Sequence, residues 1–153
     1  MTKLTPPAIM LLALTGCSAF EPDYYNCNAQ VSSYAEGVRS SIVTEESNQA
    51  VEVRLNGVSA RCYDSGDMVI AELGIGMKVS RDLEQGVDVE PVTVPMVAAV
   101  IDNDDSVKQT MSFVYTMQFT RNLDVLYPLV RREFTIPKGG RIILSLTPEV
   151  VSQ

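Results

Sequence analysis

Residues 107–119 read Val-Lys-Gln-Thr-Met-Ser-Phe-Val-Tyr-Thr-Met-Gln-Phe, and large apolar side chains occupy all but one of the odd positions. Polar side chains occupy most of the even positions. A period of two residues is typical of a β-strand with one buried and one solvated face. The stretch therefore predicts a long strand over 107–119.

Other stretches share this alternation or are apolar on both faces, as expected for a central strand. Helical periodicity is hard to find beyond the N-terminal segment. In addition to 107–119, we predict strands at 51–62, 69–79, 92–101, 131–136 and 141–146, with weaker candidates at 30–34 and 38–43.

Several positions modify these strands. The alternation changes parity at Asn56-Gly57, which predicts a bulge or a tight turn. Gly74 and Gly76 predict a bend or a close backbone neighbour. Pro95 has no N–H to donate, so we expect an irregularity there. Residues 137–140, Pro-Lys-Gly-Gly, predict a hairpin between the last two strands.

Seven or eight strands with little helix predict an all-β fold, an antiparallel immunoglobulin-like β-sandwich. A small closed barrel is the alternative. The 153 residues suffice for one domain with a proper core, and 46% hydrophobic residues are typical of a globular chain.

The first sixteen residues carry one positive charge, Lys3, and an apolar run from Ala8 to Leu14. Seven helical residues span about 10 Å, far less than the ~30 Å hydrocarbon core of a bilayer. The run therefore predicts the hydrophobic region of a signal peptide rather than a transmembrane helix.

The order of a charge, an apolar run and Leu14-Thr15-Gly16-Cys17 resembles the lipobox of bacterial lipoproteins. The resemblance implies cleavage before Cys17, diacylglycerol on its thiol and acylation of the new amino group, which together hold a protein stably on a membrane. Ser18 in place of aspartate implies sorting to the outer membrane, as in Gram-negative lipoproteins. The alternative is an ordinary secretory signal with a chance cysteine.

The chain is then expected to have four parts. These are a cleaved lipoprotein signal peptide (1–16), a lipidated N-terminus and short tether (17–26), a β-sandwich domain (27–147) and a tail (148–153). Ten residue steps from Cys17 to Cys27 keep the domain within about 36 Å of the membrane.

Three cysteines in a secreted chain normally leave one unpaired. If Cys17 carries lipid, Cys27 and Cys62 remain to form a disulfide in an oxidising periplasm. Two free buried thiols are the alternative. The chain from Cys27 to Leu146, with Ala60-Arg61-Cys62-Tyr63 and Val94-Pro95-Met96-Val97-Ala98, also resembles small uncharacterised Gram-negative envelope lipoproteins with an immunoglobulin-like domain. That resemblance supports the fold and the disulfide and implies no activity.

The composition argues against several functions. The chain has no histidine, which excludes Ser-His-Asp and Cys-His catalysis and histidine-ligated metals. A formal charge of −7 disfavours nucleic acid and anionic lipid head groups as direct ligands. We therefore expect no catalytic residue and no cofactor beyond the covalent lipid on Cys17.

Clusters of acids are the remaining candidates for chemistry. Asp102, Asp104 and Asp105, with Asp64 and Asp67, could supply oxygen ligands to Ca²⁺, but the spacing is not that of an EF-hand. A solvated polar turn at 102–105 is the preferred interpretation, and no metal site is predicted. The pairs Glu45-Glu46 and Glu84-Asp88 could serve glycoside hydrolysis only across a cleft, and both fall in predicted loops.

Candidate contact residues for a partner lie in two segments. Residues 122–130 place Leu123, Leu126 and Tyr127 in a connection between strands, and Tyr24 and Tyr25 lie in the tether. Each segment either docks a partner or packs on the domain. We expect a non-enzymatic lipoprotein on the periplasmic face of the outer membrane, an accessory or structural subunit that binds another envelope protein. The alternative is a periplasmic ligand-binding or inhibitory module for a small molecule, peptide or glycan.

Overall fold

The structure is a computed structural model that describes residues 21–45, 47–82 and 89–147. The predicted signal peptide, the Leu14–Cys17 motif, Glu46, the pair Glu84-Asp88 and the tail at 148–153 lie outside the described residues.

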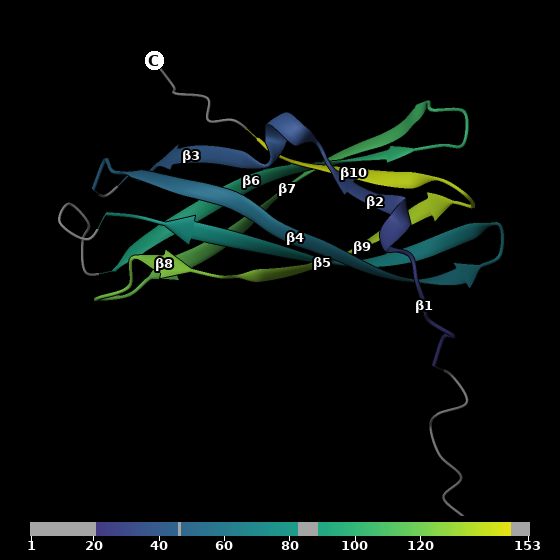
Figure 1. The fold of residues 1–153 in the computed structure, drawn as a ribbon, viewed down its shortest axis with the longest axis horizontal. Helices are drawn as coiled ribbons and strands as arrows, with labels where there is room; N and C mark the ends of the chain where they lie inside the picture. Colours follow the sequence, from purple (N-terminus) through teal and green to yellow (C-terminus); the bar gives the residue numbers. More distant parts are fainter. Residues whose placement is uncertain (1–20, 46, 83–88, 148–153) are drawn as a thin grey trace, which may run out of the picture.

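The described chain is mostly β-strand, in ten strands with two short 3₁₀ turns (Figure 1). The strands are β1 (Tyr25–Asn26), β2 (Val31–Ser33), β3 (Arg39–Val43), β4 (Ala50–Ser65), β5 (Met68–Ser80), β6 (Glu90–Ile101), β7 (Val107–Phe119), β8 (Val125–Leu126), β9 (Leu129–Pro137) and β10 (Arg141–Leu146). The 3₁₀ turns are η2 (Asn28–Gln30) and η3 (Ala35–Gly37).

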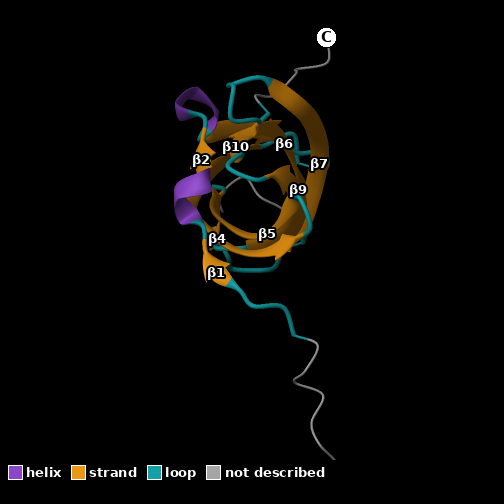
Figure 2. Cartoon of the chain, turned by 90° about the vertical axis from the view of Figure 1, so that its right-hand side faces the viewer, coloured by secondary structure: helices purple, strands orange, loops and turns teal. Residues whose placement is uncertain are grey.

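These strands form two sheets that face each other across one core (Figure 2). In sheet A, β4 and β5 lie at the centre, β1 and β3 pair with β4, and β8 and β9 pair with β5. In sheet B, the order is β2-β10-β6-β7. The all-β prediction is therefore confirmed.

The core is built from the alternating apolar positions that the sequence identified. Each long strand turns one set of side chains inward, because successive residues of a strand point to opposite faces. The largest fully buried apolar side chains are Phe119, Leu73, Ile75, Met77, Met96, Ile136, Ile142, Leu144 and Leu146.

Several strand predictions are confirmed. The strand predicted at 107–119 has the bounds of β7. The parity change at Asn56-Gly57 is a break in register between Leu55 and Gly57, inside the continuous strand β4. The polar turn at 102–105 joins β6 to β7, where the Asp105 N–H donates to the carbonyl of Asp102 at 3.1 Å.

The predicted hairpin at 137–140 is wrong. The Gly140 N–H does bond to the Pro137 carbonyl at 2.9 Å, so the turn itself is present. However, β9 pairs with β5 in sheet A, whereas β10 pairs with β6 in sheet B. The turn therefore passes between the sheets. The prediction failed because alternation reveals which face of a strand is buried and not which strand lies beside it.

Two further expectations are also corrected. Not every pair is antiparallel, since β2 runs parallel to β10. The irregularity expected at Pro95 is absent, and the β6–β7 register shifts instead between Val100 and Ile101. The carbonyl of Pro95 accepts from the Thr147 N–H at 3.1 Å, so its backbone faces the β10 side, just beyond the end of β10. The missing N–H therefore removes nothing from the β6–β7 ladder.

Candidate interaction surfaces

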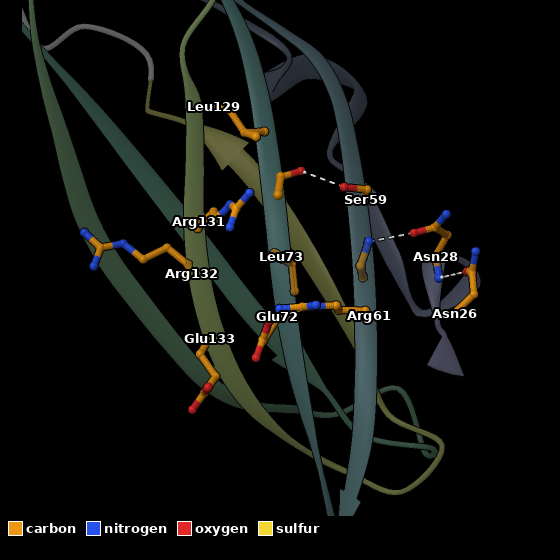
Figure 3. A pocket seen from close by; sticks show the side chains of 12 residues that line it. Asn26, Asn28, Ser59, Arg61, Glu72, Leu73, Leu129, Arg131, Arg132 and Glu133 are labelled. Carbon is orange, nitrogen blue, oxygen red and sulfur yellow. Dashed lines mark hydrogen bonds and ion pairs between the residues drawn. The ribbon is translucent and has the colours of Figure 1, made fainter. Parts of the chain in front are cut away.

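An open pocket of about 600 Å³ lies on the outer face of sheet A (Figure 3). Strands β4, β5 and β9 form it, together with the chain around β1 and η2. Its lining residues are Asn26, Asn28, Ser59, Ala60, Arg61, Glu72, Leu73, Gly74, Leu129, Arg131, Arg132 and Glu133.

Two glycines on β5 leave the backbone without an outward side chain, Gly74 in the pocket and Gly76 beside it. Gly74 and Gly76 alternate with buried residues, so a side chain at either position would point outward. A Cβ on Gly74 would lie 2.9 Å from the Ser59 Oγ, and one on Gly76 would lie 3.4 Å from the Gly57 carbonyl oxygen. The close backbone neighbour predicted from these glycines is therefore present at Gly76, whereas the neighbour of Gly74 is a side-chain hydroxyl.

One side of the pocket is a bonded cluster. Arg61 and Glu72 are directly opposite each other on β4 and β5, with 2.6 Å between Nη2 and Oε2. The Tyr24 hydroxyl donates to the Glu72 Oε1 at 2.5 Å, and the Arg61 guanidinium lies 4.3 Å from the centre of the Tyr24 ring. Hydrogen bonds from Tyr24 and then Arg61 hold the pKa of Glu72 below its usual value. Tyr24 thus packs on the domain.

The opposite side of the pocket, on β9, is not bonded in this way. Leu129 is 56% exposed, and Arg131 makes no ion pair with any described residue. Figure 3 shows Leu129 and Arg131 on the same stretch of β9. This side offers an apolar group and an available cation.

In the predicted contact segment at 122–130, some side chains pack on the core and others are exposed to solvent. Leu126 is opposite Val79 on β5 and packs against the core. Tyr127 is 67% exposed and Leu123 is 41% exposed. The structure therefore leaves Leu123 and Tyr127 available and turns Leu126 inward.

Tyr25, in the other predicted contact segment, lies in β1 opposite Cys62, and its hydroxyl donates to the Asp64 Oδ1 at 3.3 Å. Tyr24 packs edge-on against Tyr63, with 5.3 Å between ring centres. Both tether tyrosines are thus fastened to sheet A. They do not meet the 122–130 segment in one cluster, because they lie on the opposite side of β4 and β5.

A long sheet edge is the feature that the sequence did not reveal. Strand β7 is the last strand of sheet B, and among the described residues it pairs only with β6. Its 13 residues contain one charge, Lys108, and no proline. Soluble proteins usually protect such an edge with charges, prolines, bulges or a covering segment.

The position of Pro95 shows which β7 backbone groups face the open side. Pro95 is opposite Val114, and its backbone points away from β7. In an antiparallel ladder the two members of such a pair both point away from each other. The N–H and carbonyl of Val114 therefore face the open edge, as do those of Ser112 and Thr116 two residues on either side.

The outer face of sheet B is almost free of charge. Side chains of β6, β7 and β10 there are hydroxylated, amide, apolar or small. The charged residues at the margin are paired, Lys108 with Asp102 at 3.1 Å and Arg141 with Asp105 at 2.8 Å. Thr93 and Thr116 bond to each other across the two strands at 3.1 Å. The uncharged outward residues are Pro91, Thr93, Pro95, Val97, Ala99, Thr110, Ser112, Val114, Thr116, Gln118, Ile143 and Ser145.

A buried ion pair lies at one end of the sandwich. Arg81 follows β5 and Glu90 begins β6, and both side chains are almost fully buried, with 3.4 Å between Nη1 and Oε2. Arg81 also donates to the carbonyls of Leu123 and Thr120, and Ser47 donates to Glu90. These contacts are internal, so the cluster joins the two sheets and forms no open site.

The acidic turn is occupied by internal contacts. Asp102 pairs with Lys108 at 3.1 Å, Asp105 pairs with Arg141, and Asp104 accepts from the Ser106 hydroxyl at 2.5 Å. Within the described ranges, no group of three histidine, cysteine, aspartate or glutamate residues could hold a metal ion. Asp64 pairs instead with Lys138, 3.6 Å away.

The predicted disulfide is present. Cys27 and Cys62 are bonded, with 5.8 Å between their Cα atoms, and both are buried. It fastens the chain after β1 to β4. In the described part of the chain, no helix is long and apolar enough to cross a membrane.

Comparisons with known proteins give no relative. No family model, no curated protein and no solved structure matches this chain.

Proposed function

We propose that this chain is a lipid-anchored, non-enzymatic protein of the cell envelope whose β7 edge receives an extended strand of another envelope protein. The anchor is the diacylated Cys17 that the Leu14–Cys17 motif implies, on the periplasmic face of the outer membrane. The covalent lipid is the only non-protein group that this role needs.

The observation that carries the proposal is the open edge of β7. Alternate residues of this 13-residue strand present backbone donors and acceptors on a side where no described strand pairs with them. Strand addition uses such groups for affinity and alternate side chains for specificity. Here the alternate side chains, Ser112, Val114 and Thr116, are small and uncharged, so they present no charge to an incoming strand.

The order of the strands supports an immunoglobulin-like type of sandwich. Strand β5 is next to β9 in sheet A, and β6 is next to β10 in sheet B. The connections β5–β6 and β9–β10 therefore both cross between sheets, as in the Greek-key arrangement of immunoglobulin-like domains. Such domains bind partners through edges and loops and need no catalytic group.

The test is a photo-crosslinking residue at Thr116, on the open edge, and a matched one at Thr93, its partner on β6. In intact envelopes we expect adducts from position 116 and few from position 93. The crosslinked partner peptides should come from one extended segment, because an added strand aligns residue by residue.

Val114→Pro removes an N–H that faces the open edge and leaves the β6–β7 ladder intact. It should abolish the adducts at position 116, whereas Val114→Thr, which keeps the N–H, should retain them. Equal adducts from positions 93 and 116, or adducts that survive Val114→Pro, would reject the edge as the binding site. Mass spectrometry of the purified chain tests the anchor, because Cys17→Ser should yield a protein without acyl groups.

A further inference from the structure

Three cations stand in one row across sheet A. Arg39 on β3 is directly opposite Arg54 on β4, and Arg54 is directly opposite Lys78 on β5. All three are exposed and alternate with inward-facing residues, so they share the outer face. Side chains directly opposite on neighbouring strands have Cβ atoms about 5 Å apart, and like charges in such positions repel.

No described acidic side chain forms an ion pair with this row. None of the ion pairs between described residues involves Arg39, Arg54, Lys78 or Arg131. On β3, β4, β5 and β9 the outer face carries five cations, the four above and Arg61, against Glu52, Glu72 and Glu133. The outward positions of these four strands therefore carry two more cations than acids, on a chain whose formal charge is −7, and this local excess favours an anionic partner.

Exposed apolar groups adjoin the cations. Leu129 is opposite Gly76, and Tyr127, two residues earlier on the same side, is next to Lys78. The glycines at 74 and 76 add no side chain that would hold a flat partner away. Tyrosine and leucine beside arginine and lysine are typical of surfaces that rest at the head-group level of a bilayer.

The N-terminal segment crosses the same face. Tyr24 contacts Arg61, Tyr63 and Glu72, which all point outward from sheet A. In Figure 2 the segment then leaves the domain on the side of β4 and β5, away from sheet B. Seven residue steps separate Tyr24 from Cys17, which span at most ~25 Å. An anchor at Cys17 therefore brings this face, rather than sheet B, toward the membrane.

We infer that the outer face of sheet A docks on an anionic bilayer surface, with Arg39, Arg54, Lys78 and Arg131 at the lipid phosphates and Tyr127 and Leu129 among the head groups. The inference rests on the proposed lipid anchor for the orientation, and on the cation row for the lipid charge. It replaces the expectation from net charge that anionic head groups are not a ligand, because the charge is unevenly distributed. Sheet B, with its open edge, then faces away from the membrane.

The absence of tryptophan from the chain makes a direct test possible. Tyr127→Trp places a single fluorophore on the sheet A face, and Val114→Trp places a matched one on sheet B. The full-length protein, purified from membranes, is reconstituted in phosphatidylcholine vesicles with or without phosphatidylglycerol, and brominated lipids quench tryptophan at head-group depth. We expect strong quenching at position 127 that requires phosphatidylglycerol, and little at position 114.

Arg39→Glu/Arg54→Glu/Lys78→Glu should abolish the quenching at position 127, because each cation near an anionic surface contributes roughly a fivefold factor to its affinity. The matched control, Lys108→Glu/Lys138→Glu/Arg141→Glu, changes charge equally at the other end of the molecule and should leave the quenching unchanged. Circular dichroism confirms that both variants fold.

The two proposals fail in different ways. If mass spectrometry finds no acyl groups on the chain, the anchor is rejected. Binding of that chain to phosphatidylglycerol vesicles still tests whether the outer face of sheet A docks on an anionic bilayer. An acylated chain whose positions 127 and 114 are quenched equally rejects membrane docking. So does protection of the fluorophore at position 127 by poly-glutamate but not by vesicles, which would assign the cations to an acidic protein segment.

Discussion

On sheet A, outward-facing side chains of neighbouring strands are charged, and the N-terminal segment is fastened across them by the Tyr24–Glu72 bond and the Cys27–Cys62 disulfide. On sheet B, the outward side chains are hydroxylated, small or apolar, and β7 ends the sheet with its backbone open. The two faces share one core and one net charge, so the difference is not an effect of composition. It indicates that each face meets a different environment.

The same contrast appears at the sheet edges. Short strands cover both long central strands of sheet A, with β1 and β3 on one side and β8 and β9 on the other. In sheet B, β2 covers β10, and among the described strands none covers β7. The covering strands are themselves edge strands of at most 9 residues, so β7, with 13 residues, offers the longest edge for pairing among the described strands.

The largest effect is expected where the two sheets are joined, at the Arg81–Glu90 pair. Arg81→Met leaves the buried Glu90 carboxylate without its guanidinium, and should lower the free energy of unfolding by about 3–5 kcal/mol. Denaturation in urea measures the loss. Arg81→Met/Glu90→Leu should recover much of it, since an apolar pair needs no charge partner.

Arg61→Met, which breaks the exposed pair with Glu72 on the outer face of sheet A, is the matched control. It should cost far less, because water solvates the remaining carboxylate. Equal losses for Arg81→Met and Arg61→Met would contradict the burial of the Arg81–Glu90 pair.

The second largest effect is expected when the disulfide that holds β1 and the N-terminal segment on sheet A is removed. Cys27→Ala/Cys62→Ala opens a loop with a sequence separation of 35 residues, and should cost about 3–4 kcal/mol on the chain-entropy estimate. Hydrogen exchange should accelerate at the β1 amides and at the Cys27 N–H, which bonds to the Ala60 carbonyl. The exchange rates of β6 and β7 amides should keep the same order as in the unmodified protein. If β7 amides accelerated before those of β1, removal of the disulfide would act on sheet B as well as on sheet A.

The third effect is a dependence on pH that originates at Glu90. Burial raises the pKa of this carboxyl, but hydrogen bonds from Ser47 and Thr44 and the contact with Arg81 outweigh burial, and the pKa lies below its ordinary value of 4.5. A carboxylate with a lowered pKa stabilises the fold above its ordinary pKa, and this stabilisation is lost as the pH falls through the folded value. The urea concentration at the unfolding midpoint should therefore decrease as the pH is lowered below about 4.5, and it should decrease less in Glu90→Gln. Parallel profiles for the two proteins would remove Glu90 as the source.

The sequence predicted the strands well and their neighbours poorly, for a physical reason. Alternation in 107–119 and the parity change at Asn56-Gly57 record which side chains are buried, and both predictions are confirmed. Nothing local records which strand lies alongside. The turn at 137–140 was therefore assigned to a hairpin, although it passes between sheets.

The candidate surfaces depend on the same missing information. Arg39, Arg54 and Lys78 are far apart in the chain and become a row only through the register of three strands. The open edge of β7 depends on its place at the end of sheet B. The disulfide was predictable because counting cysteines needs no register. The sequence left open whether residues 122–130 pack on the domain or dock a partner, and the structure exposes Leu123 and Tyr127.

The smallest effect tests whether the cation row serves stability. Arg54 lies between Arg39 and Lys78 in the register, so Arg54→Gln removes two unfavourable cross-strand pairs and keeps much of the length of the side chain. The free energy of unfolding should rise by about 0.2–1 kcal/mol, nearer the lower value because water screens exposed charges. The gain should shrink in high salt. If Arg54 lowers stability and is needed for docking on an anionic bilayer, the cation row serves binding. If Arg54→Gln instead lowers the free energy of unfolding, Arg54 serves to stabilise the fold.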